Sequence, residues 1–328
     1  MHHVTLGGPN GLQAQIITWG GVLQNLTWPL AGGARLPLIL GFETFAPYPV
    51  HSPYFGAIVG RYANRIAGGR FSHGSRTHHL DRNEGLRTTL HGGANGFARR
   101  IWQIADLTDT SVTLALTSAD GDMGFPGTLS VTCTYSILDE SRLDVQFWAK
   151  TDQPTPVNLA QHAYFNLDGG PDIFDHSLQM FADAYTPTKA DQIPTGVIQP
   201  VEGTIFDFRQ PKPLHPSQPA FDHNFVLGNI PAPQNALRPA AQLVSHKSGL
   251  RMQVATTKPG LQFYSGQMVN LAVPGHGGRS YRPNAGLCLE TQYFPDSPNQ
   301  PSFPDSILQP DDIYAHRTAF SFDRWISA

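Results

Sequence analysis

The sequence predicts an all-β protein: one large antiparallel β domain over residues 1–328, a sandwich or a barrel, with few and short helices. Three observations predict this class. Several stretches alternate apolar and polar residues with a period of two, as half-buried strands do. The chain carries 32 glycines and 28 prolines, which leave little room for long helices. No stretch repeats its apolar residues with the helical period over three turns.

The clearest strands lie in the middle of the chain. Residues 129–137 alternate Leu, Val, Cys, Tyr and Ile with Ser and Thr, and residues 143–149 alternate in the same way after a turn-like Asp-Glu-Ser-Arg. This pair predicts a β-hairpin. Residues 112–116 and 250–255 show the same alternation. The most proline-rich stretch, 211–219, has strand patterns on both sides, so we interpret it as a long surface loop and not as a domain boundary.

Composition excludes several classes of function. Charged residues make up 14% of the chain and the net charge is −3, which gives no basic surface for nucleic acid. No apolar run reaches the ~18 residues of a membrane span, and no secretory signal is visible, so we expect a cytoplasmic protein without a membrane partner. The two cysteines, Cys133 and Cys288, lie in apolar runs and are expected as small buried side chains.

Polar residues interrupt the apolar pattern at six places, and a buried polar group belongs either to a structural network or to a site. Residues 60–66, GRYANRI, place an asparagine between two arginines, which suits sugar hydroxyls or a solvated turn. His91 precedes two glycines and, taken alone, favours an ordinary turn. His73, His78 and His79 lack the partners of a metal site and are expected at the surface.

Two of these segments contain candidates for proton transfer. His162 lies among aromatic residues in NLAQHAYFNL, where burial tunes an imidazole for general acid or base catalysis or simply places it in the core. Glu290 follows an apolar run and, taken alone, favours the solvated face of an edge strand. Asp222 in FDHNF and Gln262 in LQFYSG are further polar residues in apolar surroundings.

Together the segments resemble the aldose 1-epimerase (galactose mutarotase) family. The similar motifs are GRYANRI, LHGGANGFARRIW, NLAQHAYFNL, FDHNF, LQFYSG and LETQYFPDSPNQPSFP, which occur in the family's order over nearly the whole chain. The resemblance implies the galactose mutarotase-like supersandwich, a large antiparallel β-sandwich with a sugar cleft. It also implies interconversion of the α and β anomers of free aldohexoses such as glucose or galactose.

The resemblance implies a role for each motif residue. Glu290 would be the general base, His162 the general acid, and His91 would assist at the sugar ring. The hydroxyl groups of the monosaccharide would be bound by Asn64, Arg65, Asp222 and Gln262. Anomer exchange moves protons and breaks one C–O bond reversibly, so one acid and one base suffice, and we expect no metal and no other cofactor.

The chain departs from the family pattern in two places. Ala160, Gln161 and Ala163 replace the family's usual neighbours of the histidine, which bears on the support of the acid. The stretch before His91, 81–89 (DRNEGLRTT), also differs, and substrate preference could differ there.

Three other functions are alternatives to a free-sugar epimerase. A sugar-phosphate (hexose-6-phosphate) 1-epimerase needs additional cationic groups for the phosphate. A glycoside hydrolase normally needs two carboxylates, for which Asp222 is the only motif partner of Glu290. A catalytically silent carbohydrate-binding protein has no need of an acid–base pair such as Glu290 and His162. The aldose 1-epimerase is the preferred hypothesis.

Overall fold

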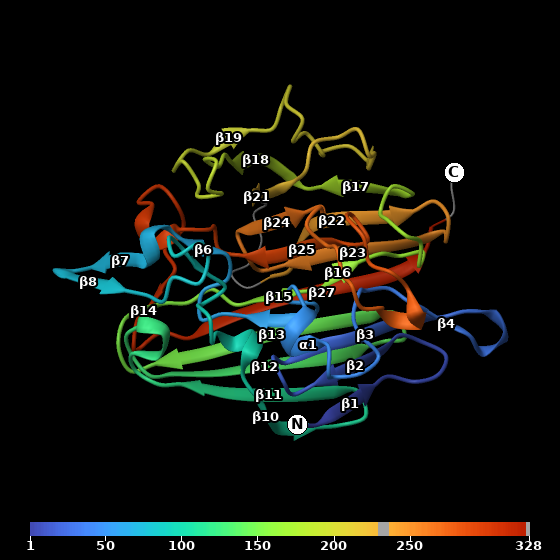
Figure 1. Cartoon of the computed structure of the whole chain (residues 1–328), viewed down its shortest axis with the longest axis horizontal. Helices are drawn as coiled ribbons and strands as arrows, with labels where there is room; N and C mark the ends of the chain where they lie inside the picture. The colour runs from blue at the N-terminus through green and yellow to red at the C-terminus, as the bar shows by residue number, and fades with distance from the viewer. Residues whose placement is uncertain (229–235, 326–328) are drawn as a thin grey trace.

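The computed structural model describes residues 1–228 and 236–325, and antiparallel strands dominate it (Figure 1). The largest sheet has nine strands in the order β10-β11-β12-β13-β27-β23-β22-β17-β20. Their bounds in chain order are β10 Gln103–Leu107, β11 Ser111–Ser118, β12 Leu129–Leu138, β13 Arg142–Thr151, β17 His176–Met180, β20 Lys212–Pro213, β22 Arg238–Ser245, β23 Leu250–Thr256 and β27 Tyr314–Arg324.

A second sheet carries much of the candidate site. It has six strands in the order β16-β25-β24-β21-β18-β19. Their bounds are β16 Tyr164–Phe165, β18 Ala182–Thr186, β19 Gln199–Pro200, β21 Asp222–Leu227, β24 Gly260–Tyr264 and β25 Leu287–Gln292. A four-stranded sheet is formed by β1 His3–Leu6, β2 Gln13–Ile17, β3 Val22–Pro29 and β4 Arg35–Pro37.

Short strand pairs and single helical turns complete the described elements. The pairs are β5 Ala57–Val59 with β15 Ala160–His162, β6 Arg65–Ile66 with β9 Thr89–Leu90, β7 Arg70–His73 with β8 Arg76–His79, and β14 Thr155–Pro156 with β26 Ile307–Leu308. The α-helix α1 spans Tyr48–His51, and 3₁₀ turns lie at Ala31–Gly33, Ala67–Gly69, Phe97–Arg99, Asp122–Gly124, His276–Gly278 and Ser297–Asn299. The expected all-β class with few short helices is confirmed.

The strands predicted from alternation are confirmed. β12 and β13 pair in one antiparallel ladder that sets Cys133 opposite Phe147. The alternating apolar side chains of β12, Leu129 to Ile137, are buried, while its Ser and Thr residues are more exposed, as the period of two requires. β11 and β23 coincide with the other two predicted strands. Both cysteines are buried free thiols, as expected.

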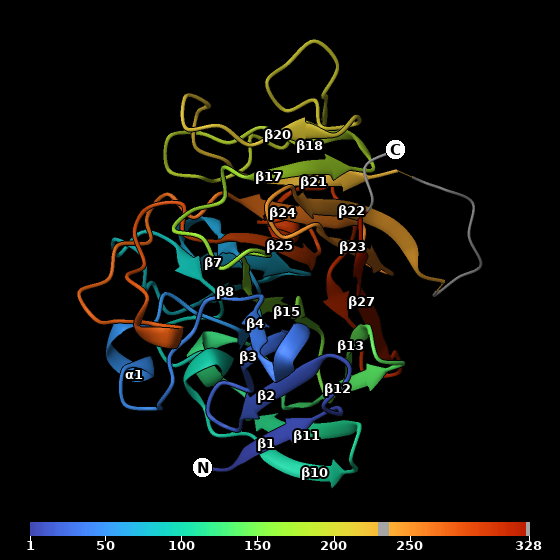
Figure 2. The ribbon, with the colours of Figure 1, turned by 90° about the vertical axis from the view of Figure 1, so that its right-hand side faces the viewer.

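The sheets pack on one another, as the two views of the ribbon show (Figures 1 and 2), and buried side chains of both large sheets belong to one hydrophobic core. It contains residues of the nine-stranded sheet such as Val145 and residues of the six-stranded sheet such as Leu289. Phe165 of β16 meets Phe320 of β27 at 5.2 Å between ring centres, so the two sheets are in direct contact. Buried residues of β1, β2 and β3 enter the same core. This is the packing of a β-sandwich, with one face of each strand turned inward.

The proline-rich stretch 211–219 differs from the expectation in one detail. Most of it is loop, but β20 pairs with β17 at the edge of the nine-stranded sheet. Proline has no N–H to donate to a ladder, and an edge strand tolerates that loss on its outer side.

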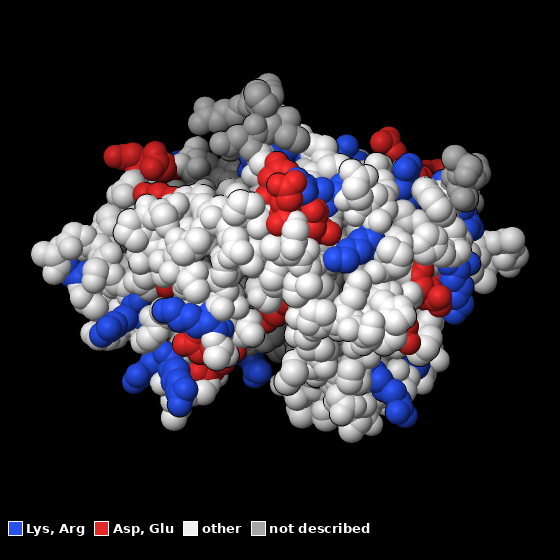
Figure 3. All heavy atoms as spheres, turned by 90° about the horizontal axis from the view of Figure 1, so that it is seen from above, with Lys and Arg blue, Asp and Glu red and all other residues white. Residues whose placement is uncertain are grey.

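Charged side chains are scattered over the surface. In the view of Figure 3, Lys and Arg lie in small separate groups among uncharged residues. Within residues 1–228 and 236–325, no helix is both long and apolar enough to span a bilayer.

Candidate active site

A pocket of about 390 Å³ brings together residues from distant parts of the chain. Six of the seven predicted site residues line it: Asn64, Arg65, His91, His162, Asp222 and Glu290. The seventh, Gln262, is buried beside the pocket and donates its Nε2 to Oδ1 of Asp222 at 2.6 Å. The structure therefore places Gln262 behind a pocket residue, not in the pocket wall.

The register of the six-stranded sheet explains how three of these residues meet. Glu290 of β25 lies opposite Gln262 of β24, and Asp222 of β21 lies opposite Tyr264 of β24. Cross-strand partners point to the same face of a sheet, so these side chains share one surface. The alternate residues, such as Leu289 and Phe263, point into the core.

Glu290 is 3% exposed, which overturns the solvated edge-strand reading that its local sequence favoured. β25 lies between β16 and β24, so it is an interior strand. Burial raises the pKa of Glu290 to about 8; the nearby carboxylate of Asp222 adds to the rise and the cation of Arg65 opposes it. Its Oε2 has no hydrogen-bond partner among the described residues. At neutral pH this carboxyl group therefore holds its proton most of the time.

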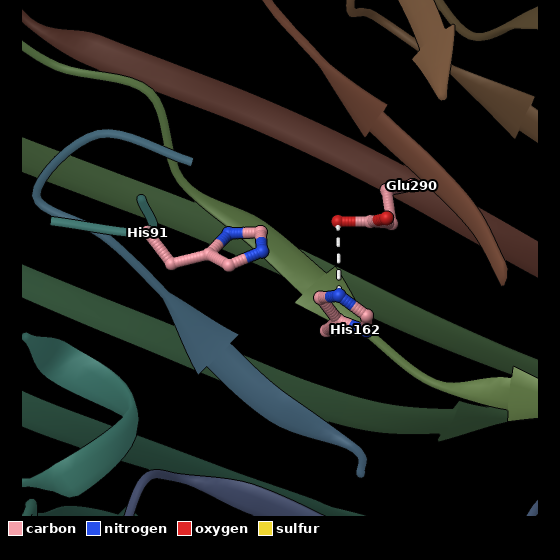
Figure 4. A group of neighbouring side chains, drawn as sticks. All are labelled: His91, His162 and Glu290. Atoms are coloured by element: carbon pink, nitrogen blue, oxygen red, sulfur yellow. Dashed lines mark ion pairs between the residues drawn. The ribbon is translucent and has the colours of Figure 1, made fainter. Parts of the chain in front are cut away.

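His162 faces Glu290 across the pocket. Its Nε2 lies 3.7 Å from Oε2 of Glu290 (Figure 4). Tyr54 and Tyr164 stack beside its ring, with centres 5.8 Å and 5.2 Å away. Burial lowers the pKa of His162 to about 4, outweighing a hydrogen bond to its own backbone. Its Nδ1 is 3.6 Å from Sγ of Cys288. The imidazole is thus neutral at neutral pH and turns Nε2 towards the carboxyl group.

His91 is fixed by a reciprocal pair of contacts with Asn64. The backbone N–H of His91 donates to the carbonyl of Asn64 at 3.0 Å, and the backbone N–H of Asn64 donates to Nδ1 of His91 at 3.1 Å. Both residues have positive φ, 52° and 64°. Gly92 follows at φ 85°, where a Cβ would lie 2.1 Å from the carbonyl oxygen of Gly60. The backbone at Gly92 therefore approaches Gly60 too closely for any side chain.

The tautomer of His91 bears on metal binding. Potential ligand atoms of His91, His162 and Glu290 all lie within 4.8 Å of one another, a spacing that a metal ion could use. Because Nδ1 of His91 accepts an N–H, the proton of the neutral ring is on Nε2. Burial, His162 and Arg65 all lower the pKa of His91 well below its ordinary value, so the ring is neutral. An Nε2–H faces the pocket as a hydrogen-bond donor and not as a metal ligand.

Arg65 and Asp222 form the polar end of the pocket. Arg65 Nη1 lies 3.7 Å from Oδ2 of Asp222. Its Nε and Nη2 donate to the two oxygens of Glu84, each at 2.8 Å. Burial opposes the charge of Arg65, but its hydrogen bonds to Glu84 and the negative charges of Asp222, Glu84 and Glu290 together outweigh burial and raise the pKa of Arg65. Charged donors and acceptors thus lie together at one end of the pocket.

The sequence did not reveal several pocket residues. These are Pro53, Tyr54, Leu90, Gln192, Tyr264, Gln267 and Met268. Tyr54 has φ 68° and its ring centre lies 4.7 Å from that of His91, so it shapes the floor beside both histidines. A tyrosine in a loop carries no periodic signal, which is why sequence reasoning missed it. Tyr264 follows Gln262 by two residues in LQFYSG. Residues two apart on a strand point to the same face, and this spacing was the available clue.

Other motif residues have structural roles. Arg61 is buried and donates to the carbonyl oxygens of Pro126 and Gly127, each at 2.8 Å, so it lies outside the pocket. Gln161, a departure from the family pattern, donates to the carbonyl of Gly56 and accepts from the N–H of Ala163. These two hydrogen bonds therefore hold the backbone on either side of His162 in place.

Comparison with known proteins identifies the family of this chain. The sequence profile described as aldose 1-epimerase matches residues 2–321. The chain is 43% identical to the galactose mutarotase of Mus musculus over 319 residues, which is 95% of this chain and 91% of that protein. It is 38% identical to the aldose 1-epimerase of Escherichia coli (strain K12) over 331 residues, 97% of this chain and 94% of that protein.

Two solved structures have the same fold over nearly their whole length. An aldose epimerase homologue from C. elegans superposes with a TM-score of 0.92 at 29% identity, covering 99% of both chains. A galactose 1-epimerase from Lactobacillus acidophilus superposes with a TM-score of 0.82 at 27% identity, covering 99% of this chain and 95% of the other. The supersandwich expected from the sequence is confirmed, and the chain belongs to the aldose 1-epimerase family.

Proposed function

We propose that this protein is an aldose 1-epimerase, an isomerase that interconverts the α and β anomers of free aldohexoses such as glucose and galactose. The observation that carries the proposal is the juxtaposition of Glu290 and His162. They lie 3.7 Å apart in one buried pocket, and their pKa values of about 8 and about 4 depart in opposite directions from the ordinary ones. Paired groups displaced in this way are typical of acid–base sites.

The reaction needs only proton transfers to and from oxygen. The carboxylate of Glu290 takes the proton of the C1 hydroxyl while the imidazolium of His162 gives a proton to the ring oxygen. The bond between C1 and the ring oxygen breaks, its electron pair goes to that oxygen, and an open-chain aldehyde forms. Rotation about C1–C2 presents the other face of the aldehyde. The same groups then act in reverse and close the ring.

The resting protonation of the pair matches one state of this cycle. Before ring opening the pair holds one proton, on His162; after opening it still holds one, on Glu290. The described site favours the second form, with a protonated carboxyl and a neutral imidazole. That form suits ring closure, because the carboxyl can protonate the aldehyde oxygen and the imidazole can accept the C5 hydroxyl proton.

Binding groups lie around this pair. Arg65, Asp222 and Asn64 supply donors and acceptors for hydroxyls away from C1, and His91 supplies an Nε2–H. Both anomers and the open chain must stay bound, so a firm grip on the unreactive hydroxyls keeps the reacting carbon in place. A silent sugar-binding protein would gain nothing from burying an unpaired carboxyl such as Glu290, since such burial is costly.

The pocket draws its residues from positions between 53 and 290, so residues 1–328 are proposed to act as a single domain. The cytoplasmic location stays a prediction.

The test is polarimetry on freshly dissolved α-D-glucose and α-D-galactose. Wild-type protein is expected to bring the rotation to equilibrium faster than the buffer blank, and Glu290→Gln is expected to match the blank. Glu202→Gln is the matched control, because Glu202 is 81% exposed and lies outside the pocket. Acceleration by both Glu290→Gln and wild type would reject the assigned base, and no acceleration by wild type would reject the function.

A further inference from the structure

The pocket is lined by a single cationic side chain, and that side chain is already hydrogen-bonded to a carboxylate of the protein. Of the residues that line the pocket, Arg65 alone is a lysine or an arginine. Arg99 is near enough to affect the pKa of Tyr54, but it is exposed and does not line the pocket. Asp222 and Glu290 bring carboxyl groups to the same space.

Glu84 forms an ion pair with the guanidinium group of Arg65. Its two oxygens accept from Nε and Nη2 at 2.8 Å each, the bidentate geometry in which an arginine–carboxylate pair is strongest. Arg65 is 12% exposed and Glu84 is 34% exposed, so the pair is partly shielded from water. The remaining nitrogen, Nη1, faces Oδ2 of Asp222 at 3.7 Å. Two carboxylates therefore surround one cation.

The loop around Glu84 holds this carboxylate in place. Thr88 donates its hydroxyl to Oε2 of Glu84 at 2.8 Å, and the backbones of these two residues bond to each other across the loop. Asn83 exchanges two hydrogen bonds with the backbone of Leu90, beside His91. The loop belongs to the stretch 81–89, where the sequence departs from the family pattern. Its geometry is thus tied to the pocket.

We propose that Glu84 determines substrate specificity: by engaging Arg65, it leaves the pocket without a free cation, so that the site accepts neutral aldoses and rejects aldoses carrying a phosphate or a carboxylate. This inference rests on the proposed epimerase function. An anionic sugar entering the pocket meets the carboxylate of Asp222 and finds the best donors of Arg65 already used. Like charges in a partly buried site repel, and an anion loses hydration that no free cation of the pocket replaces.

The experiment compares three substrates in three proteins. Polarimetry gives kcat/KM for D-glucose, D-glucuronate and D-glucose 6-phosphate with wild type, Glu84→Gln and Glu84→Asp. Wild type is expected to favour glucose. Glu84→Gln removes the charge and frees Arg65, so the ratio of anionic to neutral kcat/KM should rise by about tenfold, the worth of one charged hydrogen bond. Glu84→Asp keeps the charge, and its ratio should stay near that of wild type.

The ratio separates specificity from a structural role. If Glu84 merely supported the fold, Glu84→Gln would lower all three kcat/KM values together and leave the ratio unchanged, which would overturn the proposal. Thr88→Val loosens Glu84 without changing charge and should raise the ratio by roughly threefold; it serves as the test if Glu84→Gln does not fold. Glu202→Gln should change nothing.

The two proposals fail in different ways. Wild type that turns over no glucose would reject the epimerase function. Wild type that turns over glucose and both anionic sugars equally well would leave the function standing and reject the role of Glu84.

Discussion

Replacing Glu290 with glutamine should stabilise the protein in a pH-dependent way while it removes activity. The carboxyl group is buried and its pKa is raised from the ordinary 4.5 to about 8. Glutamine has the same shape and no charge. Because the folded state holds the proton of Glu290 more tightly than the unfolded chain does, the free energy of unfolding of wild type falls as the pH rises from 4.5 to about 8. Glu290→Gln has no such carboxyl group, so its free energy of unfolding does not fall for this reason.

The magnitude follows from the shift itself. Each pKa unit corresponds to about 1.4 kcal/mol, so the full rise of roughly 3.5 units corresponds to about 5 kcal/mol. Between pH 5 and pH 8 the wild type should lose about 3 kcal/mol that Glu290→Gln keeps. His162 is present in both proteins, so its own pH dependence largely cancels in the difference. An effect of the new amide that is the same at every pH moves the whole stability curve of the variant up or down and leaves the pH dependence of the difference unchanged.

The assay is equilibrium unfolding in urea at pH 5, 6, 7 and 8. The quantity of interest is the free energy of unfolding of the variant minus that of wild type, with equal m-values as the condition for comparison. Glu202→Gln, at an exposed position, should give a difference that stays flat with pH. A flat difference for Glu290→Gln as well, or one that shrinks towards pH 8, would refute the raised pKa and with it the proton-holding role of this residue.

Three further predictions concern activity and packing. The pair formed by Glu290 and His162 must hold one proton, so kcat/KM, after subtraction of the blank, should depend on pH as a bell-shaped curve. It should fall below pH about 4, where the base becomes protonated, and above pH about 8, where the acid loses its proton. A kcat/KM that stays constant across pH 8 would contradict this. Gly92→Ala should cost more than about 2 kcal/mol in urea unfolding, because its Cβ meets backbone, whereas Gly74→Ala, also at positive φ but in open space, should cost about 1 kcal/mol. Arg61→Met should lower the free energy of unfolding by about 3 kcal/mol or more, because it leaves buried carbonyl oxygens without a hydrogen bond. The folded variant should keep the wild-type KM for glucose. A raised KM would show that Arg61 takes part in sugar binding.

The strands of the largest sheet were predictable because their chemistry is periodic. β12 and β13 alternate without interruption, and burial on one face is the direct cause of that alternation. β25 is different: all six of its residues are buried, since one face packs in the main core and the other carries Glu290 into the pocket between the buried Cys288 and Gln292. A strand buried on both faces loses the alternation that would reveal which face carries Glu290.

Local sequence made His162 a candidate for proton transfer, but the rest of the site was predictable only through the family resemblance. Taken alone, the local sequence favours a turn at His91, and His91 does lie in a turn, but remote segments bury its side chain in the pocket wall. The local sequence also favours a solvated position for Glu290, and that interpretation is wrong because strands remote in the sequence bury this residue. Asn64, 27 positions away, fixes the tautomer of His91. Tyr54 reaches both histidines from a loop with no motif, and such tertiary contacts leave no local trace in a sequence.

If Glu290 acts as proposed, its carboxyl group is where protein stability and catalytic function make opposite demands. Glu290 needs burial to hold a proton near neutral pH, and that burial destabilises the fold as the pH rises. A hydrogen bond to the ionised Oε2 would relieve the conflict, but it would also lower the pKa and weaken the carboxyl as a proton donor in ring closure. The unpartnered oxygen, placed 3.7 Å from His162, is therefore best explained as a property that the proposed reaction requires. The surrounding sandwich, with its core shared between sheets, supplies the stability that this arrangement gives up.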